Sequence, residues 1–187
     1  MIKFFAFIWL KVFKCPWSKL RWWKYRNTES RVVQKVDEDN MQSVVNDINN
    51  HFEWTMDDVS QLFDSMRPAP YLYNWYLNTV ENGGKVTDDC DGCHTIIYHI
   101  LKQNGFDVAL ITVVTKPFTQ SHTMTVIRNV NKDEKNTYRV INYRNISKEY
   151  YSLDDFAKDY SLPVRGWYLH EYDYADKKFR NVNKKDF

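Results

Sequence analysis

A cysteine follows two aspartates at the start of a predicted amphipathic helix, and this junction limits the possible folds more than any other part of the chain. Apolar side chains recur at three- and four-residue spacing, which predicts a helix with one buried stripe made of Cys93, Ile96, Ile97, Ile100 and Leu101. Asp88 or Asp89 can accept hydrogen bonds from the first turn, and Gly105 supplies a left-handed C-terminal cap. We therefore expect Cys90 at or near the first helical position.

The predicted position of Cys90 favours a reactive thiol. The first turn of a helix has unpaired backbone N–H groups and the positive end of the helix dipole, and both stabilise a thiolate relative to a thiol. Cys93 lies about one turn further along and belongs to the buried stripe, so we expect it to be a small core residue. Cys90 is therefore the candidate nucleophile.

Three strands are predicted after this helix. Residues 107–115 form a nearly unbroken apolar run, as expected for a central strand covered on both faces. The next two strands, 122–128 and 137–142, have the pattern of a hairpin. Alternation places on one face of each strand His122, Met124, Val126 and Arg128, and Tyr138, Val140 and Asn142.

An antiparallel pairing of these two strands brings a histidine and an asparagine together. One register aligns the polar pair and the apolar pairs at once, and its pairs are His122 with Asn142, Met124 with Val140, and Val126 with Tyr138. We expect this face to pack on the helix that Cys90 begins. Cys90, His122 and Asn142 would then be nucleophile, general base and the group that fixes the tautomer of the base.

These motifs resemble those of the bacterial transglutaminase-like cysteine peptidases, a family within the papain-like superfamily. The resemblance covers about half of the chain, residues 52–143, and departs from the usual pattern at Gly92, Cys93 and His94. It also has Asn142 where the family more often has Asp. Four blocks carry it, namely Asp89-Cys90-Asp91-Gly92-Cys93-His94, Gln103-Asn104-Gly105-Phe106, Ser121-His122-Thr123-Met124-Thr125-Val126 and Tyr138-Arg139-Val140-Ile141-Asn142.

The resemblance implies a papain-like, transglutaminase-like α+β fold, with the nucleophile helix packed on an antiparallel β-sheet. It also implies acyl transfer at amide bonds through a thioester on Cys90, with a protein or peptide substrate and without a metal or organic cofactor. Peptidase, deamidase and transglutaminase use the same three catalytic residues, so the acyl acceptor stays open. The backbone N–H of Cys90 and a second donor would bind the oxyanion. The aromatic segment 71–77 is expected to line the cleft, and residues 71–76 are a candidate source of that donor.

Other interpretations of the same residues stay open. The spacing of Cys90, Cys93 and His94 is also that of c-type haem attachment, with Met124 as a second axial ligand. Haem attachment requires export, however, and the N-terminus lacks a convincing signal peptide. Zinc suits thiolate and imidazole ligands, and the available set is Cys90, Cys93 and two of His94, His99 and His122. Finally, a catalytically inactive transglutaminase-like domain would act as a binding or structural module.

Basic residues are unevenly distributed along the chain. Residues 1–26 contain seven basic and no acidic residues, whereas the net charge of the whole chain is +2, so the remainder carries −5. Basic and aromatic side chains on one helix are typical of contact with an anionic membrane surface or with a protein partner. The segment is too interrupted by charges to span a bilayer. It carries no base-reading motif, so no specific nucleic acid is expected.

The 187 residues predict one domain with appendages. Its expected parts are the basic segment 1–26, a polar linker and short helix over 27–50, a transglutaminase-like domain over 51–175, and a charged, mobile tail over 176–187. Further expected elements are helices over 57–66 and 154–160 and a strand over 166–172. Three cysteines without even pairing indicate a reducing compartment. We therefore expect a cytoplasmic protein, with membrane association possible through the first segment.

Overall fold

The computed structural model describes residues 20, 23–55, 67–115, 121–129 and 136–187, which form two sheets and several helices. The helices are α3 (Met41–Asn50), α4 (Ala69–Glu81), α5 (Cys90–Gln103) and α6 (Leu153–Asp159). The strands are β1 (Phe52–Trp54), β2 (Val86–Asp88), β3 (Val108–Thr115), β4 (Ser121–Asn129), β5 (Thr137–Asn142), β6 (Asn145–Ile146), β7 (Val164–Asp173) and β8 (Lys178–Asp186). β1 and β2 form a short parallel pair. The other strands form a six-stranded antiparallel sheet in the order β6-β5-β4-β3-β7-β8.

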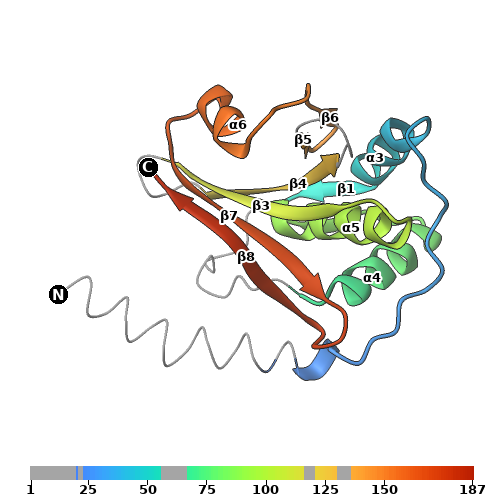
Figure 1. The fold of residues 1–187 in the computed structure, drawn as a ribbon. Helices are drawn as coiled ribbons and strands as arrows, with labels where there is room; N and C mark the ends of the chain where they lie inside the picture. Colours follow the sequence, from blue (N-terminus) through green and yellow to red (C-terminus); the bar gives the residue numbers. More distant parts are fainter. Residues whose placement is uncertain (1–19, 21–22, 56–66, 116–120, 130–135) are drawn as a thin grey trace.

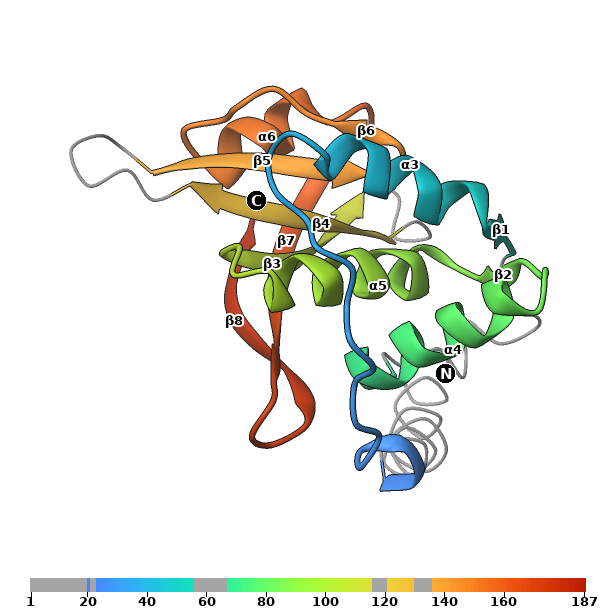
Figure 2. The same cartoon turned by 90° about the vertical axis from the view of Figure 1, so that its right-hand side faces the viewer.

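Helices cover both faces of the large sheet (Figures 1 and 2). α3, α4 and α5 lie on one face, where the core unites Ile96 and Ile100 of α5 with Leu110 of β3. α6 covers the opposite face, and its Phe156 belongs to the core that contains Met124 of β4. The predicted α+β class, with the Cys90 helix packed on an antiparallel sheet, is confirmed at this level.

Helix α5 begins and ends as its capping residues predict. The side chain of Asp89 accepts a hydrogen bond from the backbone N–H of Asp91 (3.0 Å), and Gly105 has a left-handed φ of +86°. Its burial is more complete than the predicted single stripe, because every residue from 92 to 101 is buried. The helix is enclosed by α3, α4 and the sheet. Two histidines, His94 and His99, are therefore held inside the protein.

Helix α4 forms from the aromatic segment, which the sequence pattern does not predict as helical. Pro70 lies in its first turn. Backbone N–H groups in that turn have no intrahelical partner, so the N–H that proline lacks costs the helix no hydrogen bond. Leu72, Tyr73 and Tyr76 are buried in the core that α4 shares with α5. Tyr and Trp favour strands when considered locally. Packing on α5 overrides this preference.

The observed register of the β4–β5 pair differs from the prediction by two residues. Val126 lies opposite Val140, and Arg128 lies opposite Tyr138. Because side chains alternate with a period of two, this shift keeps every residue on its predicted face. The connection between the strands sets the register, and its polar sequence carries no turn motif that would specify the length of the loop. Most of that connection lies outside the described residues.

Residues 29–36, here called the strap, lie within the predicted polar linker and cross α4 and α5 (Figure 2). The side chain of Asn104 accepts from the backbone N–H of Val36 (3.0 Å) and donates to the carbonyl of Gln34 (2.9 Å). Asn74 binds two backbone groups earlier in the strap in the same way (3.0 and 2.7 Å). These amides supply the partners that a neighbouring strand would otherwise provide. The short helix predicted within residues 27–50 is α3.

The C-terminal residues also differ from the prediction. Residues 178–186 form strand β8, which pairs with β7 at the edge of the sheet, whereas the charged sequence predicts a mobile tail. An edge strand needs only backbone hydrogen bonds on one side, and charged side chains on it discourage further pairing. The sequence of β8 therefore has no hydrophobic pattern from which the strand could be predicted. The strand predicted over 166–172 is confirmed as part of β7, and the helix predicted over 154–160 is α6.

Some predicted elements fall outside the described part of the chain. The helix predicted over 57–66 lies wholly outside the described residues, as does most of the basic segment 1–26. Within the residues that the structure describes, no helix is both long enough and apolar enough to cross a membrane.

Candidate active site

Cys90 lies at the open edge of strand β4. It is the first residue of α5, and its side chain is partly exposed. The backbone N–H of Thr123 donates to its Sγ (3.5 Å). The ladder between β4 and β5 begins at Thr125, so Thr123 precedes it and contacts the thiol. The helix N-terminus therefore meets β4 at the residue that follows His122.

His122 and Asn142 form a direct hydrogen bond. The Nε2 of His122 lies 2.8 Å from the Oδ1 of Asn142. With the amide oxygen accepting, Nε2 carries the proton and Nδ1 keeps its lone pair. Burial lowers the pKa of His122, although the bond to Asn142 and the negative charge of Asp89 act in the opposite direction. A neutral imidazole with a lone pair at Nδ1 is the form that a general base requires.

The face of the sheet that carries His122 packs differently from the prediction. Met124 and Val126, which alternate with it, belong to the core beneath α6 and not to the one beneath α5. Thr125, on the other face, contacts α5 by donating to the carbonyl of His94 (3.0 Å). The ring of His122 nevertheless lies 6.0 Å from the ring of His94. Beyond the end of β5, side chains from both faces can reach the same space at the edge of β4.

Tyr143 follows Asn142 in a left-handed conformation (φ +51°), which is uncommon for a residue other than glycine. Its ring lies 5.2 Å from that of His122 and 5.6 Å from that of His94. The N–H of Tyr143 donates to Nε2 of His94 (3.4 Å), and its carbonyl accepts from Nδ2 of Asn49 (3.1 Å). The end of β5 is therefore held by α5 and α3 together.

From the sequence, His94 is named only as a candidate ligand of haem or zinc, and neither Tyr143 nor Asn49 is named as a site residue. Two signals were nevertheless present. His94 is four residues after Cys90, which places both on one side of the helix, and Tyr143 directly follows Asn142. Asn49 has no such signal, because only the tertiary packing of α3 brings it to Tyr143.

Carboxylates surround the N-terminus of α5. Asp88 is 6% exposed, accepts from the backbone N–H of Asp89 (3.1 Å) and forms an ion pair with Arg67 (3.5 Å). A Cβ atom placed on Gly92 would overlap the Asp88 carboxylate. The unusual glycine in the first turn therefore has a local cause, since a larger residue would displace Asp88.

Burial argues against the haem interpretation. Cys93 is fully buried, and this raises the pKa of its thiol to about 12, with further contributions from Cys90 and Asp88. His94 is also fully buried, and its Nδ1 faces the hydroxyl of Thr125 (3.4 Å) while its Nε2 faces the backbone N–H of Tyr143. Haem attached at Cys93 and ligated by His94 would require both side chains to open to solvent.

The placement of the candidate ligands argues against the zinc interpretation. The ring nitrogens of His99 bond to the hydroxyls of Ser30 (2.7 Å) and Tyr174 (2.8 Å), away from the cysteines. Across the described part of the chain, no group of three or more His, Cys, Asp or Glu side chains is arranged to hold a metal ion.

The segment 71–76, from which the sequence suggests a second oxyanion donor, has one hydroxyl that already has a hydrogen-bond partner. In the segment 71–76, Tyr73 donates its hydroxyl to a backbone carbonyl of the strap (3.2 Å). Outside this segment, Tyr143 and Tyr160 have hydroxyls whose pKa is affected by charge at Cys90. Burial raises the pKa of both hydroxyls, and charge at Cys90 raises it further. The ring of Tyr143 also lies beside that of His122, at 5.2 Å.

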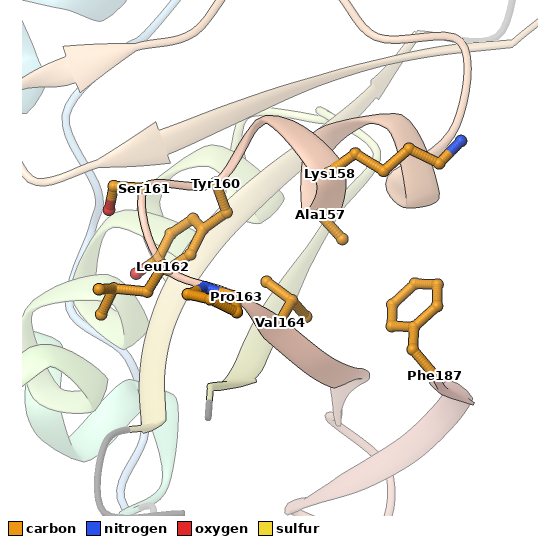
Figure 3. Close-up of a pocket in the computed structure, with 8 residues that line it drawn as sticks. All are labelled: Ala157, Lys158, Tyr160, Ser161, Leu162, Pro163, Val164 and Phe187. Carbon is orange, nitrogen blue, oxygen red and sulfur yellow. The ribbon is translucent and has the colours of Figure 1, made fainter. Parts of the chain in front are cut away.

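A surface pocket of about 500 Å³ lies beside Tyr160 (Figure 3). Figure 3 shows Pro163 and Val164 between Leu162 on one side and Phe187 on the other. The lining is mostly apolar and consists of Ala157, Lys158, Tyr160, Ser161, Leu162, Pro163, Val164 and Phe187. Tyr160 therefore lines this pocket, and it is also one of the residues whose hydroxyl pKa is raised by charge at Cys90.

Comparison with known proteins identifies no family for this chain. No protein-family model matches the chain, and no curated protein matches it. The function must therefore be inferred from the residues around Cys90.

Proposed function

We propose that this chain is a cysteine-dependent enzyme of papain-like, transglutaminase-like fold that transfers acyl groups at amide bonds of proteins or peptides. The observation that carries this proposal is the 2.8 Å hydrogen bond between His122 and Asn142, beside a thiol at a helix N-terminus. A nucleophile, a base and an orienting amide are the three groups that thiol catalysis at an amide requires. They lie on a helix and two following antiparallel strands, as in the family that the sequence resembles.

The proposed reaction begins when Sγ of Cys90 attacks the amide carbon while Nδ1 of His122 takes the thiol proton. The tetrahedral intermediate then loses its C–N bond, and His122 returns the proton to the departing amine, which leaves a thioester on Cys90. Water or a second amine attacks the thioester, with His122 again as base, and the thiol is restored. Asn142 keeps the His122 proton on Nε2, so that Nδ1 is the basic nitrogen throughout.

The substrate would lie between the N-terminus of α5 and the loop that follows α6. Amide groups of the first helical turn favour negative charge, so the N–H of Cys90 is the first oxyanion donor that we propose. Tyr143, whose ring lies 5.2 Å from that of His122, and Tyr160 are the candidates for the second, and charge at Cys90 raises the pKa of both hydroxyls. The apolar pocket beside Tyr160 would take an apolar side chain of the substrate.

We place this activity in a reducing compartment, the cytoplasm, because a catalytic thiol must stay reduced. Residues 1–26, with seven basic residues and none acidic, would bring the enzyme to an anionic membrane surface or to a protein partner.

The proposal is tested first by the reactivity of the thiols. The full chain is labelled with iodoacetamide from pH 6 to pH 8, and each cysteine is followed by mass spectrometry in wild type and in His122→Ala. Cys93 is the internal control, since it is fully buried on the same helix. We expect rapid labelling of Cys90, a loss of about a hundredfold in the variant, and slow labelling of Cys93 in both.

A second assay identifies the acyl acceptor. A glutamine-containing peptide is incubated with hydroxylamine, where hydroxamate reports transamidation, ammonia alone reports deamidation, and a new peptide N-terminus reports proteolysis.

In the labelling experiment, equal and slow labelling of Cys90 in wild type and His122→Ala would instead identify an inactive domain that serves as a binding module.

A further inference from the structure

His94 is a buried histidine next to the catalytic pair, and it has no place in the reaction described above. Its side chain is fully buried, and burial lowers its pKa to about 3, which keeps the ring neutral. A neutral imidazole has one donor and one acceptor nitrogen. Here Nε2 accepts from the backbone N–H of Tyr143, so Nδ1 carries the proton and faces the hydroxyl of Thr125. Thr125 in turn donates to the carbonyl of His94.

His94 contacts the backbone of Tyr143, the residue that directly follows Asn142. Tyr143 adopts a left-handed conformation, which is strained for a residue other than glycine and persists only where the surrounding structure imposes it. Two side chains form hydrogen bonds with its peptide groups. His94 accepts from the N–H, and Asn49 donates to the carbonyl (3.1 Å). Asn142 directly precedes Tyr143, so the direction of its side chain depends on this conformation.

We propose that His94 is a positioning residue, which acts through the backbone of Tyr143 to aim Asn142 at His122 and so to set the tautomer of the catalytic imidazole. The inference rests on the proposed function, because a fixed His122 tautomer matters only if His122 is a base. Its geometry is independent of that function. The rings of His94 and His122 meet edge to face at 6.0 Å and carry protons on opposite nitrogens, Nδ1 in His94 and Nε2 in His122.

The chain offers a matched control for the loss of a buried histidine. His99 lies on the same helix, is also fully buried, and its pKa is lowered to about 4 by burial. Its partners are the hydroxyls of Ser30, which lies in the strap, and Tyr174, which directly follows β7. A merely structural contribution of a core imidazole should therefore be lost equally in the two positions.

The experiment compares His94→Asn, His94→Gln and His99→Asn in the full chain. The amide of Gln reaches about as far as Nε2 of histidine and can accept from Tyr143, whereas the shorter amide of Asn cannot. The first readout is the tautomer of His122, obtained from the nitrogen chemical shifts of ¹⁵N-labelled histidines. The second is the rate at which iodoacetamide modifies Cys90.

We expect a single Nε2–H tautomer of His122 in wild type, His94→Gln and His99→Asn, and a mixture of tautomers in His94→Asn. Alkylation of Cys90 should fall about tenfold in His94→Asn alone. A His122 tautomer that is unchanged in His94→Asn, or disturbed to the same extent in His99→Asn, would overturn the proposal.

Two further comparisons keep the test decisive. If His94→Asn does not fold, Asn49→Ala loosens the same turn from α3, and it should produce the same mixture of His122 tautomers. An unchanged tautomer in that variant would also overturn the proposal. Failure of the proposed function would look different, because Cys90 would then be unreactive in wild type while the His122 tautomer would still respond to His94.

Discussion

Gly92 and Asp88 form a pair in which each residue depends on the other. A Cβ atom on residue 92 would overlap the carboxylate of Asp88, which is held in place by Arg67 and by the backbone of Asp89. Alanine is favoured over glycine in helices by about 1 kcal/mol, yet overpacking of this kind costs about 1–3 kcal/mol. We expect Gly92→Ala to lower the free energy of unfolding by about 1–2 kcal/mol in urea denaturation. The double variant Gly92→Ala with Asp88→Ala should be less destabilised than the sum of the two single changes, and simple additivity would contradict the overlap.

The pH dependence of the Cys90 thiol follows from the surroundings of His122. Burial is the largest influence and lowers the pKa of His122 below the ordinary value of 6.5, while the hydrogen bond that His122 donates to Asn142 raises it. A base whose pKa is lowered loses its lone pair only at lower pH, so alkylation of Cys90 should persist below pH 6.5 before it declines.

Asn142→Ala removes a contribution that raises this pKa. We expect the decline to move to still lower pH and the maximal rate to fall, because the tautomer of His122 is no longer fixed. Stopped-flow measurement of iodoacetamide modification between pH 4 and pH 8 tests both effects. A decline that already begins above pH 6.5 would contradict a base with a lowered pKa and would match an ordinary thiol, whose reactivity falls as the pH drops below about 8.5.

The strap is an element whose order depends on a few side-chain amides. Asn104 holds the backbone at Val36 and at Gln34, and also donates to the carbonyl of Ile100 in α5 (2.9 Å). Asn104→Ala should lower the free energy of unfolding by about 1–3 kcal/mol, since the N–H of Val36 loses its partner. Hydrogen exchange should accelerate at Val36 more than in the core of α5. Equal acceleration in both would mean that the variant weakens the whole fold.

Elements governed by local chemistry can be predicted from this sequence, whereas those governed by distant contacts cannot. The bounds of α5 follow from Asp89 and Gly105, which are neighbours of the helix ends. The β4–β5 register depends on a connection without turn motifs, so the prediction is two residues off although the faces are correct. Strand β8 exists through backbone pairing with β7, and its charged side chains conceal it.

The candidate site shows the same division. Cys90, His122 and Asn142 each carry a chemical signal in the sequence, and the structure brings His122 to Asn142 and the thiol to the neighbouring Thr123. The sequence predicts that the face of β4 that carries His122 packs on α5, and this is wrong, because that face packs on α6. The contact arises from the end of β5, which leaves the edge of β4 open, and the position of a strand end relative to a helix N-terminus is a property of the whole fold.

For the whole molecule, buried neutral histidines make stability depend on pH. Unfolded imidazoles bind protons near pH 6.5, whereas burial lowers the pKa to about 3 for His94 and to about 4 for His99 in the folded state. Between these values the unfolded chain binds more protons, so the free energy of unfolding falls as the pH falls. Each histidine contributes up to about 1.4 kcal/mol per pH unit in its window, and neither adds a further loss once the folded form is also protonated.

Urea denaturation at a series of pH values from 7 to 4 tests this linkage. We expect the stability of wild type to decrease steadily below pH 6.5, and the variant His99→Gln to show a shallower decrease because one titrating group is absent. His99→Gln is the cleaner variant, since His99 contacts the strap and β7 and not the candidate catalytic residues. The variant should be less stable than wild type at pH 7, and the difference should shrink as the pH is lowered. A constant difference across the series would show that protonation of His99 does not oppose folding, and that the burial of this imidazole stabilises the protein through packing alone.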